Sequence, residues 1–282
     1  MIIPSLDPCS GGTSQVIRNI IPELDKLGLQ NEVLCLDDPA ASFIVKDPFI
    51  VNAVGPAKGP WGYSEKLVPW LIENLGRFDV VVIHALWLYH GYGFNKALKQ
   101  YKKQMLKHGK PAKLPRFYVM PHGMLNPYFQ QASERKIRAL HNWVYWKLIE
   151  SKLVNNADGL LFTCKTELLL ARKSFSPYHP KKEVNVGFGV EPPPTFETVM
   201  STAFFEICPE VKGHSFILSL SRILEKKGVD HLLEAYVQLL EMSEHPATTD
   251  NESQLQKLVI AGPGLDTPYG KKMQQLVASS KN

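Results

Sequence analysis

The stretch Ser219-Leu-Ser-Arg222-Ile-Leu-Glu-Lys-Lys227-Gly228-Val-Asp-His-Leu-Leu-Glu-Ala235 decides the fold. It leads from an apolar strand predicted over 215–220 into an amphipathic helix predicted over 228–241. A second apolar run, 257–261, follows and predicts another strand. Two strands joined through a helix form the repeating unit of a parallel sheet, so this stretch indicates an α/β fold.

The loop between that strand and helix carries two cations, Arg222 and Lys227. Arginine offers a planar fork that suits phosphate, and lysine offers a compact charge. The second strand ends in Gly262-Pro-Gly264, where glycines allow a close approach of the backbone. These residues either form a pocket for a phosphate-bearing ligand or are solvated charges beside a turn. The strand–loop–helix context favours the pocket.

The same alternation extends through the rest of the chain. The residues after Gly11-Gly12 predict a helix with Val16, Ile20, Leu24 and Leu27 on one face. Residues 133–153 predict an aromatic-rich helix, and a further helix starts near residue 268. The remaining apolar runs predict strands at 2–3, 32–36, 79–83, 116–120 and 159–163.

Composition limits the class of protein. The 282 residues are 44% hydrophobic and 21% charged with a net charge of +5, which is typical of a globular protein of two domains. The four cysteines are widely spaced, which indicates a reducing cytoplasm and neither a zinc site nor a disulfide framework. No leader peptide or membrane span is recognised, since the longest apolar run, 80–89, is short and contains His84.

Residues that could carry chemistry follow the predicted strands of the N-terminal half. Gly11-Gly12 opens a helix, where free N–H groups favour an anion or the glycines make a plain turn. His122 follows one strand and either binds a sugar hydroxyl or exchanges a proton, or it caps the strand end. His84 follows another strand with Trp87 nearby, and an aromatic face suits a sugar ring or a core wall.

The segment 96–116 carries eight basic residues and no acidic one. It is either a solvated helix and loop or a contact with an anionic membrane surface or acceptor. Nucleic acid is not expected as a partner, because no nucleic-acid-binding module is recognised and the net charge is small. The chain also lacks GxGxxG after the first strand, GxxxxGK[ST], GxSxG and HExxH.

Taken as a set, several motifs of this chain resemble those of the group 1, family 4 glycosyltransferases of the GT-B fold. They follow the family's order over almost the whole chain. They are Pro4-Ser5-Leu6-x-Pro8-x-x-Gly11-Gly12, Pro121-His122-Gly123-Met124, Ala157-Asp158-Gly159-Leu-Leu-Phe-Thr163, Gly187-x-Gly189-Val190-Glu191, Ser221-Arg222-Ile-Leu-x-x-Lys227-Gly228-Val-Asp230 and Leu258-Val-Ile-Ala-Gly262-Pro-Gly264.

The resemblance implies two Rossmann-like, doubly wound domains that face a cleft. They would be an acceptor-side domain over 1–200 and a partial nucleotide-sugar-binding domain over 201–282, with a linker where the composition changes around 176–213. The implied activity is retaining transfer of a sugar from a nucleotide-sugar donor to a glycan, lipid-linked or small-molecule acceptor, in cell-envelope or exopolysaccharide synthesis. No metal and no cofactor is implied, and the protein would be cytoplasmic or peripheral at the inner face of the membrane.

The resemblance also implies roles for single residues. Arg222 and Lys227 would hold the donor diphosphate, Gly262 and Gly264 would lie beside it, and Gly11 and Gly12 would line the same phosphates. His122 would lie at the transferred sugar as the catalytic residue. The acceptor side would be formed by the loops that contain His84, Trp87 and Asn126.

The sequence departs from the family pattern in one respect. The family's two glutamates eight residues apart, which hold the donor sugar and ribose, would lie beyond Gly264, and the 282 residues do not contain them. We therefore expect a chain truncated at its C-terminus and clipped at its first strand. Two alternatives stay open: a non-catalytic remnant or binding module, and a nucleotide-sugar epimerase on the same fold.

Overall fold

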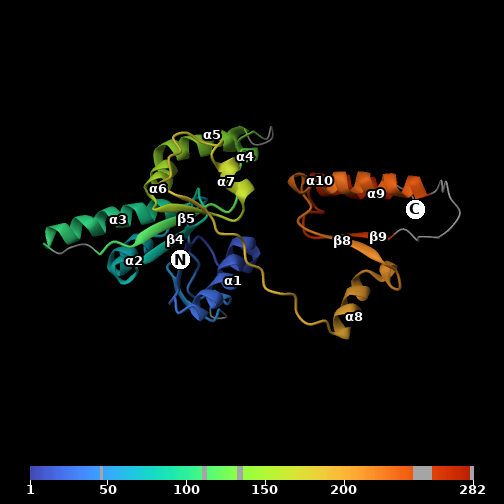
Figure 1. Ribbon diagram of the computed structural model, residues 1–282, viewed down its shortest axis with the longest axis horizontal. Coiled ribbons are helices and arrows are strands. Elements are labelled where there is room, and N and C mark those ends of the chain that lie inside the picture. Colours follow the sequence, from blue (N-terminus) through green and yellow to red (C-terminus); the bar gives the residue numbers. More distant parts are fainter. Residues whose placement is uncertain (45–46, 110–112, 132–135, 244–255, 280–282) are drawn as a thin grey trace. The chain divides into compact units, whose positions relative to one another are not determined.

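The computed structural model describes residues 1–44, 47–109, 113–131, 136–243 and 256–279. The chain divides into two compact units, unit 1 (Met1–Pro192) and unit 2 (Pro193–Asn282). Figure 1 labels the elements of both units. The α/β class expected from the sequence is confirmed.

Unit 1 is built on a seven-stranded sheet whose order is β3-β2-β1-β4-β5-β6-β7 and whose neighbours are all parallel. In the sheet, β2 and β3 lie on one side of β1, and β4 to β7 lie on its other side. The strand order therefore reverses between β1 and β4, where ligands of doubly wound folds bind. The strands are β1 (Ile2–Ile3), β2 (Glu32–Cys35), β3 (Ile50–Ala53), β4 (Val80–His84), β5 (Arg116–Met120), β6 (Gly159–Phe162) and β7 (Glu183–Asn185).

Helices cover both faces of this sheet. The α-helices of unit 1 are α1 (Gly12–Lys26), α2 (Leu67–Asn74), α3 (Tyr89–Lys107), α4 (Tyr128–Gln131), α5 (Lys136–Tyr145), α6 (Ser151–Asn156) and α7 (Lys165–Ala171). Short helices are η1 (Pro8–Ser10), η3 (Leu75–Arg77) and the π-helix η5 (Trp146–Glu150). One core joins α2, α3 and α6 to β4, β5 and β6, and a second packs α1 on β1 and β2.

The apolar face of α1 differs from the expected one. Val16, Ile17 and Ile21 are buried, whereas Leu27 is 77% exposed. The helix ends at Lys26 and the chain turns at Gly28, which has a φ of +78°. Leu27 therefore lies past the end of the helix, where the 3.6-residue period no longer applies.

The long helix expected over 133–153 is divided. It is formed by α5, η5 and α6, and residues 132–135 lie outside the described residues. The π-helix widens the backbone for one turn, and its residues Trp146 and Glu150 are completely buried.

Unit 2 is smaller. It contains α8 (Thr198–Ile207), η6 (Pro209–Val211), β8 (Phe216–Leu220), η7 (Glu225–Lys227), α9 (Val229–Ser243), β9 (Lys257–Ala261) and α10 (Pro268–Ser279). β8 and β9 pair in parallel over five residues each, and α9 and α10 pack through Ile223, Val229, Leu233 and Met273. Of the polar loop expected over 244–256, all but the last residue lies outside the described residues.

The boundary between the units lies at residues 192 and 193, ahead of the expected 200. The reason is that α8 belongs to unit 2, where the ring of Phe204 stacks on Phe216 of β8 at 5.2 Å between centroids. The expected linker over 176–213 contains ordered elements, since β7 pairs with β6 and closes the sheet of unit 1. Among the described residues, no helix is both long enough and apolar enough to span a membrane.

Candidate active site

Three loops leave the carboxyl ends of β1, β4 and β5, which are neighbours at the point where the strand order reverses. They contain Gly11-Gly12, the residues after His84, and the residues after Met120. Because parallel strands end at one edge of the sheet, these loops share that edge. The structure thus places the predicted residues of unit 1 on neighbouring loops.

The loop after β1 is held by Asp37, which follows β2. One carboxylate oxygen accepts from the Ser5 hydroxyl at 2.6 Å, and the other accepts from the Leu6 amide at 2.7 Å. The loop then reaches Gly11, which has a φ of +98°, and α1 begins at Gly12 without a side-chain cap. A Cβ at either glycine would meet nothing within 4 Å, so the start of α1 is open and can receive an anion.

His84 and His122 touch each other at the ends of β4 and β5. His84 Nδ1 lies 2.9 Å from His122 Nε2, and the rings stack at 5.2 Å between centroids. Burial lowers the pKa of His122 to about 4 and, together with the nearby His122, lowers the pKa of His84 well below 6.5. Both rings are therefore neutral at pH 7. One of the two nitrogens carries a hydrogen and donates a hydrogen bond to the other.

The side chain of His84, which the sequence assigns to the acceptor side, is buried at the end of β4. It is only 1% exposed and lies against His122. His90, on α3, supports this arrangement because its Nε2 lies 2.8 Å from the backbone oxygen of His84. Within the described part of the chain, His84 Nε2 and His90 Nδ1 are buried and have no hydrogen-bond partner. The contact of His84 with an acceptor stays a prediction.

The backbone at these strand ends adopts unusual conformations. Ala85, Trp87 and His122 have φ values of +70°, +71° and +53°, which are uncommon for residues with a side chain. Such residues concentrate at functional sites and persist only where their surroundings hold them.

Two glutamates hold this backbone. Glu150 Oε1 accepts from the Trp87 amide at 2.8 Å. Glu167 Oε1 accepts from the Gly123 amide at 2.5 Å, while its other oxygen accepts from the amide and the hydroxyl of Thr163. Two carboxyl groups from later elements thus fix the loops that carry His84 and His122.

Sequence reasoning missed both glutamates, and Glu150 is the more unusual of the two. It is completely buried, and burial raises its pKa to about 8 in spite of the hydrogen bond from Trp87, so it is mostly protonated at pH 7. Among the described residues its Oε2 has no partner. The only hint in the sequence was an acid inside an aromatic helix, since glutamate is rarely buried without a role.

Trp87 and Asn126 also have structural contacts. The ring of Trp87 packs beside Phe175 at 5.2 Å and beside Trp146 at 6.3 Å between centroids, so the ring contributes to the aromatic packing of unit 1. The side-chain oxygen of Asn126 accepts from the Tyr128 amide at 2.9 Å, where α4 begins. Their contact with an acceptor stays a prediction.

The predicted donor residues of unit 2 come together. The Ser221 amide donates to the oxygen of Ala261 at 3.1 Å, and the Ile223 amide donates to the oxygen of Pro263 at 2.8 Å. The loop that carries Arg222 therefore runs beside the loop with Gly262 and Gly264. The glycines allow this approach, because a Cβ at Gly262 would lie 1.9 Å from the Ser221 oxygen, and one at Gly264 2.5 Å from the Ile223 oxygen.

Arg222 and Lys227 are exposed, and in the described residues neither forms an ion pair. Gly228, with a φ of +65°, turns the chain directly into α9, so both cations precede the positive end of a fifteen-residue helix. The carboxylate of Asp230, in the first turn of α9, accepts a hydrogen bond from the Tyr269 hydroxyl at 2.8 Å. Two free cations before a helix N-terminus form an environment for an anion.

The described residues contain no group of three or more His, Cys, Asp or Glu side chains that could bind a metal ion.

A search of curated proteins found no match. Among solved structures, a trehalose-6-phosphate synthase is similar to this chain with 12% sequence identity and a TM-score of 0.44, over 99% of this chain and 68% of that one. The family model described as "Glycosyl transferase 4-like domain" matches residues 11–182, which are more than half of the chain and include the loops of His84 and His122. The chain therefore belongs to the family of glycosyl transferase 4-like proteins.

Proposed function

We propose that this glycosyltransferase moves a sugar, with retention of configuration, from a nucleotide-sugar donor to a glycan, lipid-linked or small-molecule acceptor. The observation that carries the donor assignment is the pair of exposed, unpaired cations, Arg222 and Lys227, before the N-terminus of α9 and beside the Gly262–Gly264 loop. A diphosphate matches this set of charges and amides. The resemblance to retaining family 4 enzymes supports the stereochemistry.

In this reaction the bond between the sugar C1 and the diphosphate oxygen breaks, the acceptor oxygen bonds to C1, and its hydroxyl proton passes to the departing diphosphate. Negative charge develops on the departing diphosphate, and the positioned cations Arg222 and Lys227 stabilise it. His122 is neutral near pH 7, so we assign it hydrogen bonding to the transferred sugar rather than the role of a cationic acid. No metal and no cofactor is part of this proposal, and its setting is cell-envelope or exopolysaccharide synthesis.

Donor binding is the experiment that tests this proposal. The full chain is titrated calorimetrically with UDP, GDP and ADP and with their glucose conjugates. We expect one of these nucleotides to bind and Arg222→Ala to weaken that binding at least tenfold. Lys212→Ala is the matched control, since Lys212 is an exposed cation that precedes β8 at the opposite end of the strand. Loss of binding in both variants, or in neither, contradicts the donor assignment.

Turnover separates the alternative functions. With a binding donor and a mixture of acceptors, transfer supports the proposal, and Arg222→Ala should slow it by about a hundredfold or more. Donor binding without any turnover favours a non-catalytic binding module. Release of free sugar and nucleotide that needs no acceptor favours an epimerase.

A further inference from the structure

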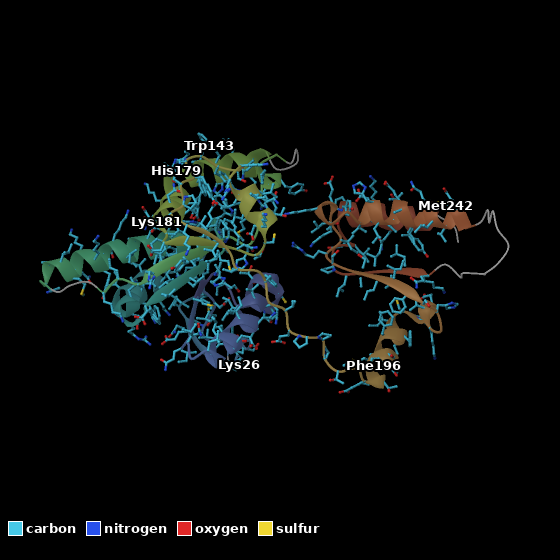
Figure 2. The ribbon with its side chains drawn as sticks, viewed as in Figure 1. Lys26, Trp143, His179, Lys181, Phe196 and Met242 are labelled. Carbon is cyan, nitrogen blue, oxygen red and sulfur yellow. The ribbon has the colours of Figure 1, made fainter. Side chains whose placement is uncertain are left out.

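Unit 1 presents an apolar stripe on the outside of a helix. Figure 2 labels Trp143 on α5, at the outer side of the unit. The stripe consists of four aliphatic residues spaced three or four positions apart, Ile137, Leu140 and Val144 on α5 and Leu148 on the π-helix η5 that continues it. Their exposed fractions are 89%, 63%, 42% and 63%, and the neighbouring Trp143 is 51% exposed. Side chains of this kind gathered on one exposed face mark an interaction surface.

The opposite face of the same helix is firmly packed. Tyr145 and Trp146 are buried, and the Tyr145 hydroxyl accepts from the Trp61 indole at 2.6 Å and donates to the oxygen of Leu88 at 3.3 Å. The Trp146 indole donates to the oxygen of Pro177 at 3.2 Å. The helix is therefore already docked on the core through its aromatic side, and the stripe is a second face that this packing leaves exposed.

Charge around the stripe is of one sign. The sequence from Lys136 to Ile149 contains three lysine or arginine residues and no acid. Arg138 and Lys147 are exposed, and Lys147 Nζ lies 5.8 Å from the centre of the Trp143 ring. An apolar face with tryptophan and flanking cations is the pattern of a helix that lies in the interface of an anionic bilayer.

We propose that the stripe, together with Arg138 and Lys147, docks unit 1 onto an anionic lipid surface. The sequence alone favoured the basic segment 96–116 for such a contact. In the structure the lysines of α3, such as Lys99 and Lys103, are exposed, but Leu106 is the only large aliphatic residue of the described part of that segment that is mostly exposed. Cations without apolar neighbours attract an anionic surface from a distance, whereas insertion needs the apolar stripe of α5 and η5.

The docking has a consequence for the site. Tyr145 ties α5 to Leu88 in the loop after β4, so the bilayer would meet unit 1 near the strand ends that carry the candidate site. A lipid-linked acceptor presents its head group at that level. The docking itself does not require the proposed transfer, and failure of one leaves the other standing.

The test is co-sedimentation of the full chain with vesicles. We expect the protein to bind vesicles of phosphatidylcholine containing about one third phosphatidylglycerol, and to bind pure phosphatidylcholine vesicles at least tenfold more weakly. Leu140→Asp with Leu148→Asp should reduce binding to the anionic vesicles at least tenfold. The double variant Arg138→Glu with Lys147→Glu should reduce binding to the anionic vesicles by about fivefold or more for each cation replaced.

The matched control is Lys99→Glu with Lys103→Glu, which makes the same change of charge on α3 and should reduce binding less than the α5 pair does. All substituted positions are exposed, so circular dichroism and thermal midpoints should stay unchanged and exclude misfolding. Trp143→Phe should remove the blue shift of tryptophan emission that anionic vesicles cause. The proposal is overturned if the protein does not bind anionic vesicles, or if the Lys99/Lys103 variant and the Arg138/Lys147 variant lose binding equally. A dimer without vesicles that Leu140→Asp dissociates also overturns it, because a second copy would then cover the stripe.

Discussion

At the scale of single residues, the contact between His84 and His122 predicts how the site responds to substitution. His84→Phe keeps a buried ring but removes the atom 2.9 Å from His122 Nε2. We expect the ¹⁵N shift of His122 Nε2 to move, because its hydrogen bond is lost, and transfer to slow by about tenfold or more at unchanged donor affinity. His179→Phe, at an exposed histidine, is the control. An unchanged His122 spectrum would show that the two rings do not interact in solution.

The buried Glu150 predicts a dependence of stability on pH. Its pKa is about 8 in the folded chain and near 4.5 when exposed, so the folded state binds the proton more tightly. The contribution of this proton to the free energy of unfolding is fully present below about pH 4.5 and is lost as the pH rises through about 8. The slope is at most about 1.4 kcal/mol per pH unit.

Glu150→Gln isolates this effect, because the amide oxygen can still accept from Trp87 and does not ionise. The difference in the free energy of unfolding, wild type minus Gln variant, should fall between about pH 5 and about pH 8 and then level off. Three histidines, His84, His90 and His122, act in the opposite direction because their pKa values are lowered, but both proteins contain them and their contribution cancels. Parallel urea curves at every pH would mean that Glu150 is ionised in the folded protein.

These residues also show what the sequence could predict about the site. His84 and His122 were found because they follow apolar runs that had to be neighbouring strands. Their direct contact, and the neutral state that burial imposes, depend on packing that no local pattern contains. Glu150 was missed because its partner Trp87 lies 63 positions earlier in the chain.

At the scale of elements, the two glycines after β9 should be essential to the structure of unit 2. Gly262→Ala would place a Cβ 1.9 Å from the Ser221 oxygen at a φ of +151°. The loop would have to move away from Arg222, so we expect the free energy of unfolding of unit 2 to fall by about 3 kcal/mol or more. Gly12→Ala, whose Cβ would meet nothing within 4 Å, should change stability by less than about 0.5 kcal/mol. Equal, small effects in urea titrations would contradict the close approach.

The elements that sequence reasoning placed well were strands with continuous apolar runs, such as β4 and β5. It missed β3 (Ile50–Ala53) and β7 (Glu183–Asn185), the two edge strands of the sheet of unit 1. Both strands are short and contain polar residues, so neither gives a continuous apolar run, and both pair with a neighbouring strand, β2 or β6. The π-helix within the predicted long helix was also missed. Its residues Trp146 and Glu150 are completely buried, and such packing leaves no local pattern in the sequence.

At the scale of the whole molecule, the two units differ in the size of their cores. Unit 1 packs a seven-stranded sheet between helices, whereas in the described residues of unit 2 the buried cluster on the two-stranded sheet contains four residues, Ile223, Val229, Leu233 and Met273. On β8, Leu218 and Leu220 are 49% and 77% exposed. Because hydrophobic stabilisation scales with the apolar area removed from water, unit 2 should unfold at a lower urea concentration than unit 1.

The distribution of aromatic residues makes this order measurable. All five tryptophans lie in unit 1, at positions 61, 70, 87, 143 and 146, so tryptophan fluorescence reports on unit 1 alone, while far-ultraviolet circular dichroism reports on both units. We expect the dichroism to lose an early fraction of its amplitude before the fluorescence changes. A nucleotide that binds at Arg222 and Lys227 should stabilise only this early phase, by about 2.7 kcal/mol at a hundredfold excess over its Kd. Gly262→Ala should move the early phase to lower urea and leave the fluorescence midpoint unchanged. Superimposable dichroism and fluorescence curves would instead mean that the two units unfold as one cooperative structure.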